Sequence, residues 1–179
     1  MPNAMFELSV PVGPADHVIG PSHAPVTVVE YGDFECPNCK QAAPAVKLLL
    51  NHFADRIRFV YRHFPLEEVH PLAVHAAEAA ESAAGQGKFW PMHDMLFEHQ
   101  PRLHASNLRK YAESLQLDMD RFDSEMRDHV YLQRIREHLQ SARDSGARST
   151  PTFFVDGRIQ DVSFDLRFLF GAVEAALRK

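Results

Sequence analysis

Residues 26–39 read VTVVEYGDFECPNC, and they predict a strand, a tight turn and the start of a helix. The run 26–31 is short and rich in β-branched residues, as strands are. Strand alternation places Glu30 on the same face as Val26 and Val28. Pro37 suits the first helical position, because the N–H that it lacks would have no helical partner there. The stretch therefore predicts that Cys36 and Cys39 lie on the first turn of a helix.

The pattern extends outward on both sides of this stretch. The helix is expected to continue to about Phe53, and a second strand over 57–64 completes a βαβ unit. Helical periodicity then continues through residues 67–146. Strand character returns at 152–155, and the turn signal Asp156-Gly157 predicts a hairpin with residues 158–162. An apolar stripe of helical spacing from Leu166 to Leu177 predicts a last helix.

The helical block divides into five predicted helices. They cover about 71–85, 88–99, 106–115, a stretch after Leu117, and 131–145. Ser106 is interpreted as the N-cap of the third helix, and Asp118 or Asp120 as that of the fourth. The block is long enough to form a subdomain of its own.

The element order is thus βαβ, a helical block, and ββα. It predicts the α/β class, specifically a thioredoxin fold interrupted by an inserted all-helical subdomain. The thioredoxin-like domain is expected over residues 14–66 and 147–179, and the insertion over 67–146. Residues 1–24 lack periodicity and are expected to be irregular, with residues 1–13 as a lead-in outside the domain.

Cys36 and Cys39 are the only cysteines of the chain. A bridge between them closes almost no loop and adds little stability by chain entropy, so it indicates chemistry. At a helix start, unpaired N–H groups and the macrodipole stabilise a thiolate, which predicts a lowered pKa for Cys36. Cys36 is therefore the expected exposed nucleophile and Cys39 the resolving thiol, with Pro37 and Asn38 tuning the pair. The spacing alone also matches half of a zinc site.

Two further features support redox chemistry. Thr150-Pro151 stands just before the third strand, where a thioredoxin fold places a cis-proline whose preceding residue pairs with an extended substrate. Glu30 lies six residues before Cys36 on the core face of its strand. Burial should raise the pKa of this carboxyl group, and we expect it to accept the proton of Cys39.

Three segments resemble the DsbA-like branch of the thioredoxin superfamily. They are residues 30–39 (EYGDFECPNC), 89–94 (FWPMHD) and 149–157 (STPTFFVDG), and the resemblance extends from about residue 14 to the end. It implies that Cys36 and Cys39 are the redox pair, Glu30 the buried acid, and Thr150-Pro151 the cis-proline loop. Pro37-Asn38 differs from the Pro-His of the strongly oxidising periplasmic members, so a high oxidising power does not carry over.

These features predict a protein dithiol–disulfide oxidoreductase that works through a mixed disulfide at Cys36. The alternatives are a glutathione-using transferase or isomerase of the same superfamily, and a non-enzymatic metal-binding or chaperone-like dithiol module. The expected partners are protein thiols or disulfides, with glutathione as a candidate for exchange. No cofactor beyond the Cys36–Cys39 disulfide is expected, and no resident metal, since the eleven histidines are scattered.

Composition bounds the remaining function classes. A net charge of -5 without a dense basic run argues against nucleic-acid and anionic-membrane partners. No run approaches the roughly 18 apolar residues of a membrane helix. The first 25 residues lack the positive start and apolar core of a secretory peptide. The expected compartment is therefore the cytoplasm, or the periplasm if a signal was removed; the oligomeric state is left open.

Overall fold

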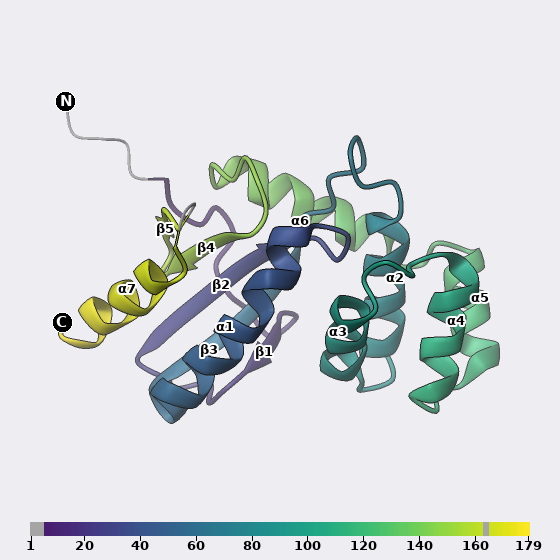
Figure 1. The fold of residues 1–179 in the computed structure, drawn as a ribbon, viewed down its shortest axis with the longest axis horizontal. Helices are drawn as coiled ribbons and strands as arrows, with labels where there is room; N and C mark the ends of the chain where they lie inside the picture. The colour runs from purple at the N-terminus through teal and green to yellow at the C-terminus, as the bar shows by residue number, and fades with distance from the viewer. Residues whose placement is uncertain (1–5, 163–164) are drawn as a thin grey trace. The chain divides into compact units, whose positions relative to one another are not determined.

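The computed structural model describes residues 6–162 and 165–179, so the first five residues of the predicted lead-in lie outside the described part (Figure 1). The chain folds into two compact units. Unit 1 comprises Met1–Gly32, Gln41–Arg62 and Gln140–Lys179, and unit 2 comprises Asp33–Lys40 and His63–Leu139. The residues around the two cysteines thus belong to the mainly helical unit 2. The predicted insertion over 67–146 stays a prediction.

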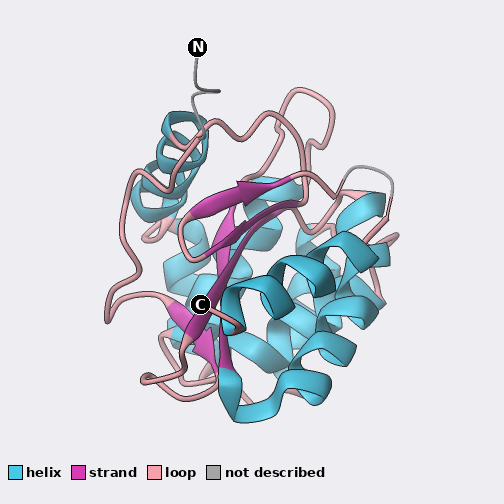
Figure 2. Cartoon of the chain, turned by 90° about the vertical axis from the view of Figure 1, so that its left-hand side faces the viewer, coloured by secondary structure: helices cyan, strands magenta, loops and turns pink. Residues whose placement is uncertain are grey.

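A five-stranded sheet organises unit 1. Its strands are β1 (His17–Ile19), β2 (Val26–Gly32), β3 (Ile57–His63), β4 (Thr152–Val155) and β5 (Arg158–Gln160). Their order is β1-β3-β2-β4-β5, and β1/β3, β2/β4 and β4/β5 pair antiparallel. The strands, magenta in Figure 2, are rotated relative to one another, as sheet twist requires. β2 lies in the centre of the order, which explains why six of its seven residues are buried.

Helices α1 (Pro37–Phe53) and α7 (Arg167–Leu177) lie together in unit 1. Helix α1 begins in unit 2 and continues through unit 1, and α7 packs on β2, β4 and β5. The rings of Phe53 and Phe170 lie 5.9 Å apart, so the two helices meet on one face. Leu169 and Val173 of the predicted stripe are buried. A short 3-10 turn, Ala54–Arg56, links α1 to β3.

Helix α2 is the centre of unit 2. The helices of this unit are α2 (Ala73–Ala84), α3 (Phe89–Glu98), α4 (Ala105–Ser114), α5 (Met119–Arg127) and the first part of α6 (Leu132–Asp144). Helix α2 contacts α3, α4 and α5 (Figure 1). Its buried face is rich in alanine, and small side chains let neighbouring helices approach closely.

The structure confirms most of the predicted elements and corrects two details. Asp118 caps α5 by accepting a hydrogen bond from the backbone N–H of Arg121. The N-cap of α4 is His104, so Ser106 lies inside the first turn. Strand β1 occupies a stretch that was expected to be irregular, because its three residues depend on pairing with β3.

The predicted hairpin between β4 and β5 is present. Asp156 and Gly157 adopt φ angles of 46° and 80°, the left-handed region that a type I′ hairpin turn requires at both central positions. Strand β5 ends at Gln160, slightly before the predicted end. Within the described residues, no helix combines the length and the apolar character that crossing a bilayer would demand.

Candidate active site

Cys36 stands immediately before the first residue of α1. Its N–H donates to the carbonyl oxygen of Asp33 at 3.1 Å, and its own carbonyl accepts the N–H of Lys40 at 3.2 Å. Cys36 therefore takes the position of an N-cap, beside the helix N–H groups that have no helical acceptor. Cys39 follows on the first turn of the helix, as predicted.

The predicted exposure of Cys36 is wrong. Its exposed fraction is 4%, and that of Cys39 is 0%. Cys36 is nevertheless the more accessible of the two cysteines, in agreement with its predicted role as the attacking thiol and that of Cys39 as the resolving thiol. The physical reason for the low exposure is that the turn leading to Cys36 is anchored, residue by residue, to the helical unit.

Asp33 is the first anchor of this turn. Its side chain is fully buried, and one carboxylate oxygen accepts the N–H of Glu35 at 2.7 Å. The other oxygen accepts the N–H of Leu66 at 2.9 Å and lies 2.8 Å from Nδ1 of His70. Three groups from the same unit therefore satisfy one buried carboxylate, as a buried charge requires.

Glu35 and Gln100 hold the next part of the turn. Oε2 of Glu35 accepts the N–H of Leu72 at 2.7 Å. Nε2 of Gln100 donates to the carbonyl oxygens of Phe34 at 2.9 Å and of Cys36 at 2.8 Å. Both partners are acceptors, so this bonding assigns the amide nitrogen of Gln100 to the site. The side chain of Gln100 thus links the carbonyl groups of Phe34 and Cys36.

Phe34 provides the apolar anchor of the turn. Its ring is 1% exposed and lies 5.0 Å from Phe97, 5.7 Å from His93 and 6.0 Å from His63, measured between ring centroids. Aromatic rings at such separations contribute packing energy beyond burial alone. Polar and apolar contacts of one unit therefore hold residues 33–36 in place, which is what a precise reactive site needs.

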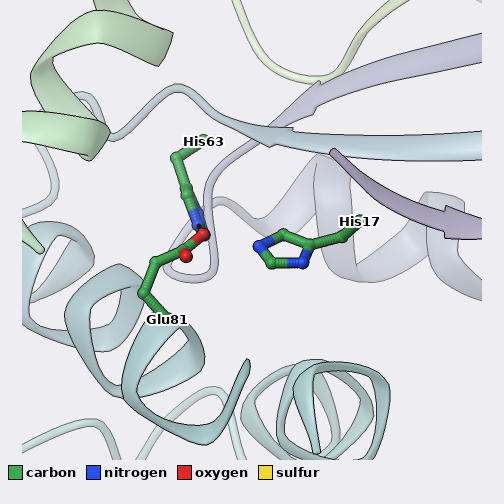
Figure 3. Close-up of side chains that lie close together, drawn as sticks. All are labelled: His17, His63 and Glu81. Atoms are coloured by element: carbon green, nitrogen blue, oxygen red, sulfur yellow. Dashed lines mark hydrogen bonds and ion pairs between the residues drawn. The ribbon is translucent and has the colours of Figure 1, made fainter. Parts of the chain in front are cut away.

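His63 of this aromatic cluster also belongs to a buried polar network. Figure 3 shows the imidazole of His63 directed at the carboxylate of Glu81, with Nε2 and Oε1 2.8 Å apart. The second oxygen of Glu81 lies 2.9 Å from Nε of Arg134. The N–H of His63 donates to Nδ1 of His138 at 3.1 Å, which assigns the proton of a neutral His138 ring to Nε2. The network carries a buried carboxylate with a permanent cation beside it.

Unit 1 contains the other predicted site residues. Glu30 is 3% exposed on β2 and pairs with Phe153 on β4. The Thr150–Pro151 peptide bond is cis, and it lies just before the start of β4. Pairing of the two strands thus brings Glu30 and the Thr150-Pro151 loop to the same part of the sheet, while Cys36 and Cys39 belong to unit 2.

The residue after Glu30 is held by a buried arginine. Arg62, 3% exposed, makes a two-point ion pair with Asp16 at 2.8 and 2.9 Å and donates to the hydroxyl of Tyr31 at 3.0 Å. It also donates to the carbonyl oxygens of Val10 and Pro11. Burial opposes its charge, but the bonds to Asp16 and Tyr31 outweigh that effect and raise the pKa of Arg62.

Several of these residues were absent from the sequence-based site. No motif marks Asp33, Glu35 or Gln100. The bond between Asp33 and Leu66 spans 33 positions, and the bond between Gln100 and Phe34 spans 66. Asp33 and Glu35 precede Cys36 by three positions and one position. This closeness in the chain is the only feature of the sequence that could have indicated them as site residues. Gln100 follows α3, and nothing in the sequence links it to Cys36.

Comparison with known proteins places these features in context. Residues 13–174 match the model of a family described as Thioredoxin. Among curated proteins, the chain is 53% identical over 173 residues to the Na(+)/H(+) antiporter NhaA 1 of Salinispora arenicola. That match covers 96% of this chain and 26% of the relative. The chain therefore spans about a quarter of the length of the curated relatives it matches.

Solved structures match over nearly the whole chain. BdbD of Bacillus subtilis superposes with a TM-score of 0.82 at 23% identity, covering 90% of this chain and 92% of that one. A thioredoxin-like oxidoreductase of Silicibacter pomeroyi gives 0.81 at 27% identity, with coverages of 93% and 95%. DsbA2 of Pseudomonas aeruginosa gives 0.72 at 25% identity, with coverages of 92% and 96%.

Proposed function

The chain belongs to the thioredoxin family and has the DsbA-like fold that its sequence predicts, and from that premise we propose that it is a protein dithiol–disulfide oxidoreductase. The observation that carries the proposal is the position of Cys36 at the N-terminus of α1, with Cys39 on the first helical turn. Helix N–H groups and the macrodipole favour an anionic sulfur at that position.

The reaction proceeds in two exchanges. The Cys36 thiolate attacks one sulfur of a partner disulfide, and the partner's S–S bond breaks as its second sulfur leaves as a thiolate. The Cys39 sulfur then attacks Cys36 in this mixed disulfide, and the Cys36–Cys39 bond forms as the partner's remaining thiolate leaves. The partner gains two electrons and the protein loses two. The reverse sequence oxidises a partner dithiol.

Other residues assist these exchanges. Glu30, which is buried on β2, accepts the proton of Cys39 during resolution. Thr150-Pro151 presents backbone to an extended partner segment, since the cis bond precedes a strand and edge pairing is a general mode of peptide recognition. Pro37 and Asn38 tune the stability of the thiolate from inside the motif.

A trapping experiment tests the central step. Cys39→Ser cannot resolve the mixed disulfide, so partner proteins should accumulate on Cys36 and be released by dithiothreitol. Cys36→Ser is the matched control and should trap nothing. An absence of thiol-sensitive adducts with Cys39→Ser in cells would contradict a protein substrate. Full activity of Cys39→Ala with glutathione would instead indicate the glutathione-using alternative.

The direction of electron flow follows from the reduction potential of the pair. Cytosolic glutathione is poised at roughly -220 to -320 mV, depending on the method. A couple well above this range would stay reduced in the cytoplasm and act as an oxidant or sensor, whereas one well below it would act as a reductant. Equilibration of the chain with defined glutathione mixtures measures the potential. The cytoplasmic location stays a prediction.

A second candidate function is redox control of a Na(+)/H(+) antiporter. It rests on the relatives of up to 53% identity that are named as such antiporters and that contain the matching segment within about a quarter of their length. Antiport can be measured in inverted vesicles carrying the Salinispora arenicola relative without its matching segment, with this chain added. The exchange rate should depend on thiol redox state with the wild-type chain and not with Cys36→Ser/Cys39→Ser. Equal rates with both chains would exclude this candidate.

A further inference from the structure

In unit 2, two partly exposed histidines flank a glutamate whose side chain is buried beneath them. His75 and Glu78 are one turn apart on α2, and His129 lies between α5 and α6. We propose that these three side chains form a site for a borderline divalent cation of the Zn²⁺ class. The site is separate from the cysteine pair, and none of its residues takes part in the proposed exchange reaction.

The carboxylate of Glu78 is the fixed point of this site. Its side chain is 2% exposed, and Oε1 lies 2.8 Å from Nδ1 of His129. Oε2 is buried without a hydrogen-bond partner, and the nearest charged or titratable group paired with it is Nδ1 of His75 at 4.0 Å. A buried carboxylate oxygen without a partner is costly, which indicates that this oxygen accepts a ligand absent from the polypeptide.

The charge of Glu78 is compensated differently from that of its neighbour. Glu81, one turn further along α2, lies 2.9 Å from the guanidinium of Arg134, a permanent cation. Glu78 has only His75 and His129 as ion-pair partners among the described residues. Imidazole neutralises a carboxylate only while it carries a second proton, whereas a bound divalent cation neutralises it in the deprotonated state.

The donor set fits a three-ligand metal site once the two exposed imidazoles rotate toward Glu78. Two histidines and one glutamate form a known zinc ligand set that leaves a position open for water. The two rings are 5.9 Å apart and edge-on, while zinc–nitrogen bonds of about 2.0–2.1 Å on a tetrahedral ion place two ring centroids about 5 Å apart. The side chains of His75 and His129 are 43% and 50% exposed, so they can rotate over the remaining distance.

The same donors exclude hard cations. Imidazole nitrogen suits zinc, copper and nickel, whereas Mg²⁺ and Ca²⁺ take oxygen ligands. The site should therefore bind Zn²⁺ in the presence of excess Mg²⁺ or Ca²⁺. This selectivity distinguishes a coordination site from attraction of cations to the acidic chain.

Calorimetric titration with ZnCl₂ tests the proposal. The full chain carrying Cys36→Ser/Cys39→Ser should be used, because thiolates are zinc ligands and the dithiol would compete for the metal. We expect one Zn²⁺ per chain, bound equally well with excess Mg²⁺. In this background Glu78→Gln and His129→Asn should each weaken zinc binding by about tenfold or more. Mutating a residue that only hydrogen-bonds to a metal ligand already weakens metal binding by about tenfold. Asparagine keeps the left-handed backbone of His129, whose φ is 51°.

Matched controls make the result decisive. His104→Ala and Glu98→Gln remove an exposed histidine and an exposed carboxylate of the same unit, and they should leave zinc affinity unchanged. Circular dichroism must show the same helix content in all variants. The proposal is overturned if no 1:1 binding is seen, if excess Mg²⁺ abolishes it, or if Glu78→Gln and His129→Asn bind zinc as the controls do.

Discussion

The two hydrogen bonds of Gln100 allow a charge to be placed beside Cys36. In Gln100→Glu, a carboxylate oxygen replaces the amide nitrogen that lies 2.8 Å from the carbonyl oxygen of Cys36. The carbonyl oxygen of Cys36 and the sulfur of the same residue are at most about 5 Å apart, so the new charge lies within roughly 8 Å of the sulfur. A negative charge there opposes the Cys36 thiolate.

The magnitude follows from Coulomb's law. At about 8 Å, two unit charges repel by about 0.5 kcal/mol in bulk water and about 2.1 kcal/mol at an effective dielectric constant of 20. Repulsion destabilises the reduced, thiolate form relative to the disulfide. The reduction potential should therefore become more negative, by about 11 to 45 mV at 30 mV per 1.4 kcal/mol. The fraction of Cys36 present as thiolate at neutral pH should also fall.

Equilibration with glutathione mixtures, followed by alkylation of the remaining thiols, measures this shift. Gln133→Glu adds the same charge on an exposed part of α6 and should leave the potential near that of the wild type. Gln100→Ala removes both hydrogen bonds without adding charge, so it should cost about 1–3 kcal/mol of stability with little change in potential. A potential that moves equally in Gln100→Glu and Gln133→Glu, or that becomes more positive in Gln100→Glu, would refute the reasoning.

Three further predictions concern unit 1 and the proposed proton acceptor. Arg62→Met removes the cation that pairs with the buried carboxylate of Asp16 and should lower the free energy of unfolding in urea by about 3–5 kcal/mol; adding Asp16→Asn should recover part of this loss, and full additivity would contradict the pairing. Gly32→Ala places a Cβ 2.6 Å from the buried ring of Tyr61 and should cost about 1–3 kcal/mol, whereas Gly171→Ala, in open space on α7, should stabilise by up to about 1 kcal/mol; equal effects would argue against overpacking. Glu30→Gln should slow release of a trapped partner while initial attack by Cys36 stays unchanged, and unchanged release rates in stopped-flow would remove Glu30 from the mechanism.

Local chemistry made much of the fold predictable. The alternation of 26–31, the helical spacing after Pro37 and the Asp156-Gly157 turn each act within a few residues, so their signals lie in adjacent positions of the chain. The α4 cap was misassigned for the same reason. A serine near a helix start is a common N-cap, but the chain entered the helix two residues earlier, at His104.

Tertiary pairing decided what local patterns could not. Strand β1 has three residues, too few to show a period, and it exists because it pairs with β3 about 40 positions later. The ion pair of Arg62 with Asp16 joins residues 46 positions apart. The sequence around each of these two charged residues carries no sign that the side chain is buried. Their burial and their pairing therefore appear only in the folded chain.

By itself, the sequence determined that two cysteines stand at a helix start after a short strand, because helix entry and strand alternation are local. Only the tertiary structure decided what holds them there. Asp33, Glu35 and Gln100 anchor the turn to unit 2 through bonds that span 33 to 66 positions, and these bonds bury Cys36 to 4% exposure. Hydrogen bonds between such distant groups leave no periodic trace in a sequence, since they depend on the path of the whole chain.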